Sequence, residues 1–136
     1  MIEAVLDASV VVKWFRSEGE RHVEPARALR RSFAAGDLVV FTPPLLRLEL
    51  VNVAGRRWRW GKEALVELAA ALDELGFEQV EPDMVRVARW TARGLTAYDG
   101  AYVAVAEQVR TQLVTDDELI LEIAREIARP LAEIRG

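Results

Sequence analysis

The 136-residue sequence contains no cysteine. This absence excludes disulfide bonds, thiolate metal sites and a cysteine nucleophile, and it suits a reducing compartment. A single histidine, His22, excludes a multi-histidine zinc site and leaves little room for histidine-based acid–base catalysis. No uncharged apolar run approaches the roughly 18 residues that a transmembrane helix needs, and no basic leader precedes the first apolar run. We therefore predict a cytoplasmic protein that makes no use of a membrane.

Glycine-rich loops that cradle nucleotide phosphates are also missing, because neither G-x-x-x-x-G-K-[ST] nor G-x-G-x-x-G occurs. The formal net charge of −4 argues weakly against a general nucleic-acid binder. Hydrophobic residues make up 51% of the chain, which is enough for a substantial core. The length suits one domain and no linker or repeat interrupts it, so we predict a single domain over residues 1–136.

Short β-type runs alternate with amphipathic helical runs along the chain. The predicted strands are residues 2–7, 37–43, 77–82 and 111–116, with a short last strand at 130–134. The predicted helices are residues 10–19, 22–36, 45–61, 62–76, 83–94, 97–110 and 117–128. Strands separated by helices imply an α/β fold with a mostly parallel central sheet covered on both faces. In such sheets ligands bind beyond the carboxyl ends of the strands.

Acidic residues occur at the positions where this topology places ligands. Asp7 follows the first strand, and Asp116 and Asp117 follow the fourth. Asp99 lies near the start of the helix that leads into the fourth strand. Glu49 lies in the helix after the second strand, on a face shared with mostly apolar neighbours. These carboxylates are candidates for a site at one edge of the sheet.

Each carboxylate also has an ordinary structural explanation. The alternatives are a helix cap at Asp7 with Ser9, a cap at Asp99, a capping box at Thr115–Glu118, and a solvent ion pair of Glu49 with Arg47 or Arg56. As a group, however, four close carboxylates repel one another unless a cation neutralises them. Mg²⁺ and Mn²⁺ accept oxygen ligands and need no histidine or cysteine. The set therefore predicts a Mg²⁺ site, in which Mn²⁺ can substitute, and phosphoryl chemistry.

Four stretches, VLDASVVVKWF, LELVNV, LTAYDGAYVAVA and LVTDDEL, together resemble PIN-domain ribonucleases, and most of all the VapC-type toxins of toxin–antitoxin pairs. The resemblance runs from Asp7 to Glu118, and the T-x-Y-D-x-x-Y element around Asp99 is its most specific part. It implies a three-layer α/β/α fold and a metal-dependent endoribonuclease that hydrolyses RNA phosphodiester bonds. It also implies a cognate VapB-type antitoxin and a homodimer.

The resemblance further implies residue roles. The catalytic carboxylates are Asp7, Glu49, Asp99 and Asp117. The metal ligands are Asp7, Asp99 and Asp117. The family's last motif usually reads T-x-D, which selects Asp117 over Asp116, so Asp116 is an accessory or alternative ligand. Three polar residues match positions that orient these groups, namely Ser9, Thr115 and Asn52, the last as a partner of the glutamate. The sequence keeps the family pattern at all four acidic positions.

The segment GRRWRWGK, residues 55–62, interleaves arginines with Trp58 and Trp60. Arginines hold phosphates, and aromatic faces stack unpaired bases at about 1–3 kcal/mol each. We therefore predict that Arg56 and Arg57 bind RNA. The alternative is that the tryptophans belong to the core or to a subunit interface while the arginines are solvated.

Three single residues and two apolar segments near the predicted site also need an interpretation. Lys13 either contacts a phosphate or is simply exposed, and His22 is an ordinary loop residue. Gly100 either lets the substrate backbone approach or accommodates packing. The apolar segments 45–53 and 63–75 are expected to form a groove or a self-association surface.

Two competing functions are open. A catalytically inactive PIN-like module that binds RNA or protein is the main alternative, and the intact carboxylate set argues against it. A phosphate-accepting receiver domain requires an acidic pair near the end of the first strand and a lysine after the last strand. Here Asp7 stands alone and no lysine follows Lys62, so the sequence disfavours the receiver domain.

Overall fold

A parallel sheet of five strands is the centre of the computed structural model, which describes residues 2–135. The strands are β1 (Ile2–Leu6), β2 (Leu38–Thr42), β3 (Glu78–Gln79), β4 (Leu113–Thr115) and β5 (Ala128–Pro130). Their order in the sheet is β3-β2-β1-β4-β5, and every pairing is parallel. The predicted α/β fold is thereby confirmed. The two end positions of the predicted domain, 1 and 136, lie outside the described residues.

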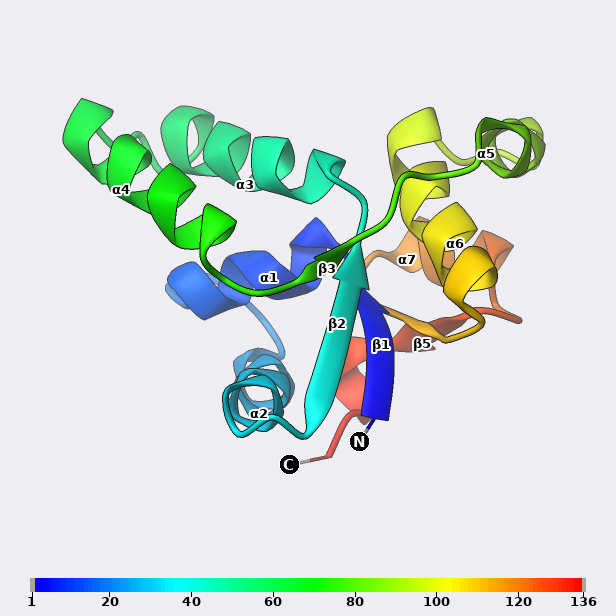
Figure 1. Ribbon diagram of the computed structural model, residues 1–136, viewed down its shortest axis with the longest axis horizontal. Helices are drawn as coiled ribbons and strands as arrows, with labels where there is room; N and C mark the ends of the chain where they lie inside the picture. Colours follow the sequence, from blue (N-terminus) through cyan, green and yellow to red (C-terminus); the bar gives the residue numbers. More distant parts are fainter. Residues whose placement is uncertain (1, 136) are drawn as a thin grey trace.

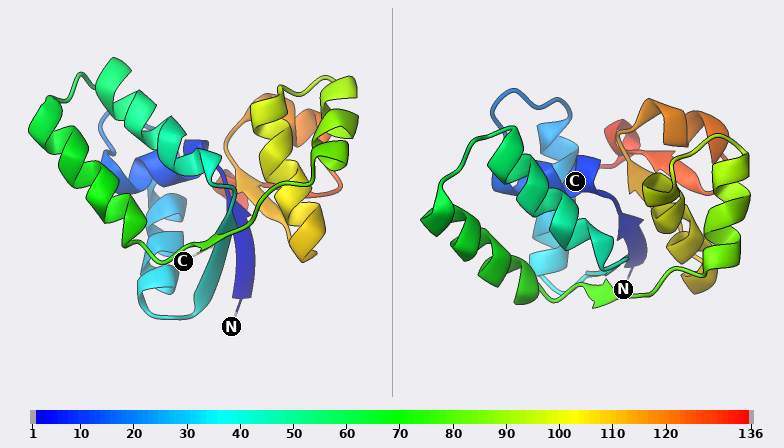
Figure 2. Two further views of the ribbon diagram at one scale, coloured as in Figure 1. Left: turned by 45° about the horizontal axis from the view of Figure 1, so that its top comes forward. Right: turned by 90° about the horizontal axis from the view of Figure 1, so that it is seen from above.

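Helices cover both faces of this sheet. They are α1 (Ala8–Phe15), α2 (Val23–Ala34), α3 (Leu45–Arg56), α4 (Lys62–Asp73), α5 (Met84–Ala92), α6 (Ala97–Val109) and α7 (Glu118–Ile123), followed by the 3₁₀ turn η1 (Leu131–Glu133). Helices α1 and α2 lie on one side of β1 and β2, and α6, backed by α5, lies on the other (Figures 1 and 2). Helices α3 and α4 pack together beside α1. This is the predicted three-layer α/β/α arrangement.

The central strands are short apolar runs because the helices bury them on both faces. Ala4, Val5 and Leu6 of β1 and all three residues of β4 are buried. Both β1 and β4 end where a polar residue begins, Asp7 in one case and Asp116 in the other. Parallel strands that stop in register bring these polar residues to one edge of the sheet. In Figure 1 this edge faces the top of the molecule.

An aromatic cluster fixes helix α1 to the rest of the fold. The Trp14 ring contacts Phe33 of α2 and Phe77 before β3, with ring centroids 5.8 and 5.6 Å apart. Its indole Nε1 donates a hydrogen bond of 2.9 Å to the carbonyl oxygen of Ala26. Burial of this large side chain holds α1 in place, and with it the neighbouring Lys13.

Several predicted boundaries are wrong, among them that of the first helix, which spans 8–15 rather than 10–19. The helix predicted to end near residue 61 ends at Arg56, because Trp58 and Trp60 leave the helix to pack against each other and the core, with ring centroids 5.2 Å apart. The helix predicted over 117–128 ends at Ile123. Residues 128–130 instead pair with β4, which satisfies the backbone groups at its open edge. The last strand therefore begins at residue 128, two residues before its predicted start, and ends at residue 130. Residues 131–133 form the 3₁₀ turn.

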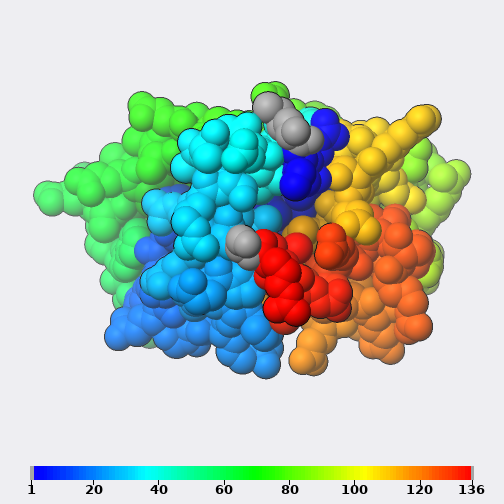
Figure 3. All heavy atoms as spheres, turned by 90° about the horizontal axis from the view of Figure 1, so that it is seen from below, coloured from blue at the N-terminus to red at the C-terminus, as the bar shows by residue number. Residues whose placement is uncertain are grey.

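The C-terminal segment closes the end of the sheet opposite to the acidic edge. Leu131 is fully buried, and Ile134 packs against the core. Seen from below, this segment lies beside α2 and β1 (Figure 3). Within residues 2–135, no helix combines the length and apolar character that crossing a bilayer requires.

Gly100 lies in the buried face of α6, at the contact with α5. A Cβ added there would meet the Val87 carbonyl oxygen at 3.4 Å and the Trp90 Cβ at 3.5 Å. These neighbours support the packing interpretation of Gly100 rather than an approach of substrate. Both distances are ordinary contacts, and alanine is a better helix former than glycine. We therefore expect Gly100→Ala to raise the free energy of unfolding by about 0.5–1 kcal/mol, measured by urea denaturation. A loss of stability would show that α5 and α6 cannot accommodate one methyl group.

Candidate active site at the carboxyl edge of the sheet

Asp7 is the most buried carboxylate of the edge, with 4% of its surface exposed. It occupies the N-cap position of α1, yet its side chain makes no capping hydrogen bond. Its two oxygens instead accept hydrogen bonds from Ser9 Oγ at 2.6 Å and Thr115 Oγ1 at 2.5 Å. The helix-cap explanation of Asp7 is therefore wrong, and two hydroxyls fix the direction of its carboxylate.

The surroundings of Asp7 disfavour its charge. Burial raises its pKa to about 7, the hydrogen bonds from Ser9 and Thr115 oppose that shift, and the charges of Asp117 and Asp99 add to it. Repulsion of this kind requires the three aspartates to lie near one another. A divalent cation among them would reverse the effect, because it favours the ionised form of each ligand.

Ser9 and Thr115 connect the ends of β1 and β4. Ser9 Oγ accepts a hydrogen bond of 2.9 Å from the backbone N–H of Asp116, and Thr115 Oγ1 accepts one of 3.0 Å from that of Asp117. Each hydroxyl thus accepts one hydrogen bond from a backbone N–H of the β4–α7 turn and donates one to Asp7. The predicted positions of these two hydroxyls, against a site carboxylate, agree with this geometry.

Asp117 caps helix α7. Its Oδ1 accepts a hydrogen bond of 2.9 Å from the backbone N–H of Ile120. The capping box expected from Thr115 to Glu118 is therefore wrong, because the cap is Asp117 and the Thr115 hydroxyl faces Asp7. The charge of Asp117 also raises the pKa of both Asp7 and Asp99, so Asp117 lies near both carboxylates while it caps the helix.

Asp99 lies in the first turn of α6 and is not its cap. The cap is Thr96, whose Oγ1 accepts a hydrogen bond of 3.0 Å from the backbone N–H of Asp99. The cap explanation of Asp99 is therefore wrong. Burial and the charge of Asp117 raise the pKa of Asp99. The carboxylate thus points toward the same edge as Asp117.

Glu49 is held by a tyrosine rather than by an arginine. The hydroxyl of buried Tyr102 donates a hydrogen bond to Glu49 Oε1. Arg47 pairs instead with Asp73, with 2.7 Å between Nη1 and Oδ1. Burial and the charge of Asp99 raise the pKa of Glu49, so Glu49 belongs to the same group of carboxylates. Its expected pairing in solvent with Arg47 is wrong, and no pairing with Arg56 occurs in the described part of the chain.

Asn52 does not take the predicted place beside Glu49. Its side chain is exposed, and no hydrogen bond between the two residues occurs within residues 2–135. One helical turn separates them, but Glu49 turns toward Tyr102 on α6 while Asn52 faces solvent. The hydrogen-bond partner that sequence reasoning missed is Tyr102. The signal for it was a tyrosine hydroxyl three positions after Asp99, within the apolar run 101–106.

Asp7, Asp99, Asp117 and Glu49 match a hard cation in donor type. All four offer oxygen, which Mg²⁺ and Mn²⁺ prefer, and their mutual repulsion leaves excess negative charge at one place. Among residues 2–135 no three acidic or histidine side chains already converge to metal-ligand spacing. Mg²⁺ usually keeps several waters and binds only one or two carboxylates directly. Carboxylates that do not all converge on one point are therefore compatible with a Mg²⁺ site.

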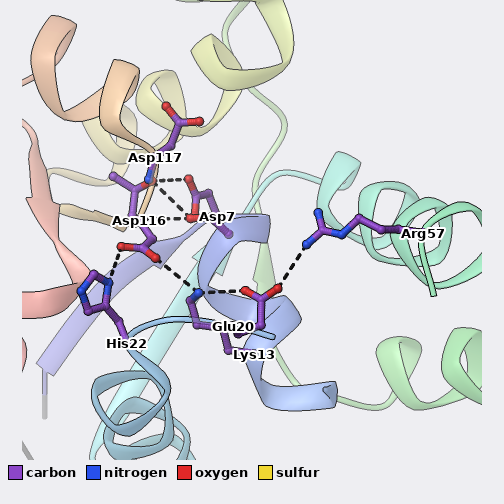
Figure 4. A network of polar contacts seen from close by, with 9 residues as sticks. Asp7, Lys13, Glu20, His22, Arg57, Asp116 and Asp117 are labelled. Atoms are coloured by element: carbon purple, nitrogen blue, oxygen red, sulfur yellow. Dashed lines mark hydrogen bonds and ion pairs between the residues drawn. The ribbon is translucent and has the colours of Figure 1, made fainter. Parts of the chain in front are cut away.

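Asp116 faces away from this group. Its Oδ2 lies 3.3 Å from Lys13 Nζ, and its Oδ1 lies 2.8 Å from His22 Nδ1 (Figure 4). Lys13 is buried, and therefore the expectation that it is exposed is wrong. His22, expected to be unremarkable, bonds to a residue of the β4–α7 turn. The structure thus gives Asp116 a set of partners different from that of Asp117.

A second carboxylate extends this network toward α3. Glu20 Oε1 lies 2.9 Å from Lys13 Nζ, and Glu20 Oε2 lies 3.1 Å from Arg57 Nη2 (Figure 4). Arg56 is exposed, whereas Trp58 and Trp60 are partly buried against the core. Of the predicted RNA-binding residues, Lys13 and Arg57 therefore meet at one place, and Arg56 does not join them. Glu20 was missed, because nothing in its local sequence marks it.

Comparison with known proteins identifies the family of the chain. The PIN domain family model matches residues 4–126. Acidic residues at the carboxyl edge of a parallel sheet are typical of a cation-binding site. The family match covers most of the chain, so the chain belongs to the PIN-domain family. PIN domains are generally nucleases. No curated protein sequence matches the chain significantly.

Two solved structures share the fold. The crystal structure of PAE2754 from Pyrobaculum aerophilum is 24% identical with a TM-score of 0.64, over 96% of this chain and 92% of that one. VapC20 of Mycobacterium tuberculosis, described as a sarcin-ricin loop cleaving toxin, is 20% identical with a TM-score of 0.62, over 83% of this chain and 87% of that one. At these identities the likeness concerns the fold.

Proposed function

We propose that the chain is a metal-dependent endoribonuclease, the toxin of a VapBC-type toxin–antitoxin pair. The observation that carries this proposal is the buried Asp7 carboxylate at the carboxyl edge of the sheet, which two hydroxyls fix in direction and which lies close enough to Asp99 and Asp117 for their charges to raise its pKa. Holding carboxylates this close together, one of them buried, costs stability, and such groups cluster at functional sites. Family membership supports hydrolysis of a nucleic-acid backbone as that function.

In this proposal Asp7, Asp99 and Asp117 would hold Mg²⁺, or Mn²⁺ in its place, in part directly and in part through waters that the ion keeps. When bound, the cation neutralises the scissile phosphate and promotes deprotonation of the attacking water. Ser9 and Thr115 hold the Asp7 carboxylate in one direction. Glu49, kept in place by Tyr102 and disfavoured as an anion by burial, is suited to accept the proton of the water. Asp116, bonded to Lys13 and His22, positions the turn and is not proposed as a ligand.

The proposed partners follow from the same site. RNA supplies the phosphates, and Lys13, Arg56 and Arg57 are the proposed contacts to them. A VapB-type antitoxin and a homodimer are proposed from the family resemblance and from the fold shared with a VapC toxin. The exposed Leu48 on α3 and Val66 on α4 lie on the helix pair predicted to associate with another chain.

Cleavage of a pool of structured RNA by purified, antitoxin-free protein tests the proposed function. We expect cleavage with Mg²⁺ or Mn²⁺, none with EDTA, and recovery when the metal is restored. Asp99→Asn keeps the shape of the side chain and removes its charge, so cleavage should fall to the level seen with EDTA. Cleavage that persists in the variant would exclude Asp99 from the site. RNA binding without any metal-dependent cleavage would favour the inactive PIN-like module.

A further inference from the structure

A cavity of about 450 Å³ opens beside the candidate active site. Polar and charged residues line much of it, including Ser9, Lys13, Glu20, Arg21, Arg57 and Asp116. Two of them belong to the hydrogen-bond network of Asp7, because Ser9 bonds both to Asp7 and to the backbone of Asp116. The cavity therefore adjoins the proposed site of the scissile phosphate, with Ser9 common to both.

Two cations in the cavity converge on one carboxylate. Lys13 approaches Glu20 from α1, with 2.9 Å between Nζ and Oε1, and Arg57 approaches it from the end of α3, with 3.1 Å between Nη2 and Oε2 (Figure 4). The side chain of Glu20 is 14% exposed. Each oxygen of Glu20 thus contacts a different cation. A phosphate, with its several anionic oxygens, can be bound by the same pair.

The charges of the network balance only while Glu20 is in place. Lys13 and Arg57 contribute two positive charges, and Glu20 and Asp116 contribute two negative ones. If Glu20 swings out, Lys13, Arg57 and Asp116 together carry a single positive charge. Arg21 also lines the cavity, so the same movement leaves three positive charges there against the one negative charge of Asp116, and this excess attracts an anion.

Glu20 is the member of the network that can leave it. It lies in the loop between α1 and α2, directly after Gly19, which is exposed and adopts a φ of +77°. Arg57 is also accessible, with 64% of its side chain exposed. Lys13, by contrast, is buried in α1 and keeps Asp116 as a second partner at 3.3 Å. The cation pair can thus persist after Glu20 has moved.

We propose that Lys13 and Arg57 form a phosphate subsite for the RNA chain, and that Glu20 occupies this subsite in the free protein until a phosphate displaces it. This inference rests on the proposed function only in taking RNA as the ligand. Glu20 then competes with the substrate for the two cations. The affinity of the protein for RNA is therefore lower than it would be if Lys13 and Arg57 were unpaired.

The test compares RNA binding by Glu20→Gln and Glu18→Gln. Glu18 lies in the same loop, pairs with Arg16 and is 82% exposed, so its variant removes the same charge without touching the cavity. The probe is a short labelled single-stranded RNA of mixed sequence, titrated in EDTA so that binding is measured without cleavage. We expect Glu20→Gln to bind about fivefold more tightly than Glu18→Gln at low salt. Its plot of log K against log salt should be steeper by about 0.7, the value for one added phosphate contact.

Arg57→Gln tests whether the gain comes from the subsite. In the wild-type background the effect should be small, because Glu20 already occupies Arg57. In the Glu20→Gln background the substitution should remove most of the gain. Equal binding by the two glutamine variants, or equal effects of Arg57→Gln in both backgrounds, would overturn the proposal. Because binding is read without metal, the proposed nuclease could fail its own test while this result stands, and the reverse also holds.

Discussion

We expect Asp7→Asn to abolish RNA cleavage and, at the same time, to make the metal-free protein more stable at neutral pH. The first effect follows from the loss of a proposed metal ligand between Asp99 and Asp117. We expect a reduction of about a thousandfold, since a catalytic metal supplies several kcal/mol of transition-state stabilisation. The second effect follows from removal of a carboxylate whose charge the folded protein disfavours.

The stability effect has a definite dependence on pH. In the folded protein burial raises the pKa of Asp7 to about 7, whereas its ordinary value is 3.8. Between these values the folded state holds a proton that the unfolded chain has released. The free energy of unfolding therefore falls as pH rises. The contribution of Asp7 is fully present below about pH 4 and is lost as pH rises through 7.

Denaturation with urea at several pH values measures this contribution. A pKa raised from 3.8 to about 7 corresponds to at most about 4 kcal/mol. Asparagine keeps the shape, and its amide oxygen can still accept a hydrogen bond from one hydroxyl. We expect Asp7→Asn to exceed the wild type by about 2–4 kcal/mol at pH 8 and by much less at pH 4, in EDTA throughout. The raised pKa values of Asp99 and Glu49 leave a smaller slope of the same sign.

Two controls separate this effect from a general loss of negative charge. Asp37→Asn removes the same charge from an exposed position before β2, and its stability should stay within about 0.5 kcal/mol of the wild type. Addition of Mg²⁺ should stabilise the wild type, as any ligand of the folded state does, but not Asp7→Asn. Destabilisation of Asp7→Asn at pH 8 would mean that its two hydrogen bonds outweigh the cost of its charge.

The order of strands and helices could be predicted because burial leaves a direct mark on composition. Strands β1 and β4 are short, largely apolar runs followed by aspartates. Residues 101–106 of α6 are apolar on all sides, since this part of the helix packs between the sheet and α5. The position of β5 could not be predicted. Residues 128–130 adopt a strand only because β4 offers an open edge, and that is a tertiary effect.

Candidate carboxylates could be chosen from the sequence, but their bonds could not. A cap and a site ligand are the same residue type at the same position, and only the direction of the side chain distinguishes them. Asp7 stands at an N-cap and bonds to two hydroxyls, whereas Asp117 stands at an N-cap and does cap. The pairing of Glu20 with Arg57 joins residues 37 positions apart, and no local pattern encodes such a distance.

Asp117 has a structural role and a proposed catalytic role, and two substitutions separate them. Asparagine caps helices as well as aspartate does, whereas alanine does not. We expect Asp117→Asn to keep the free energy of unfolding within about 0.5 kcal/mol, and Asp117→Ala to lose about 1 kcal/mol with the hydrogen bond to Ile120. Both variants lose the ligand charge, so RNA cleavage should fall about a hundredfold or more in each.

Asp83 provides the matched control for this comparison. It caps α5 as Asp117 caps α7, with its Oδ1 3.3 Å from the backbone N–H of Val85, and it is exposed and outside the group of site carboxylates. Asp83→Ala should therefore cost a similar amount of stability and leave cleavage unchanged. If Asp117→Asn cleaves RNA as fast as the wild type, then Asp117 is a cap alone. The metal would then have to be held by Asp7 and Asp99, since Asp116 is already bonded to Lys13 and His22.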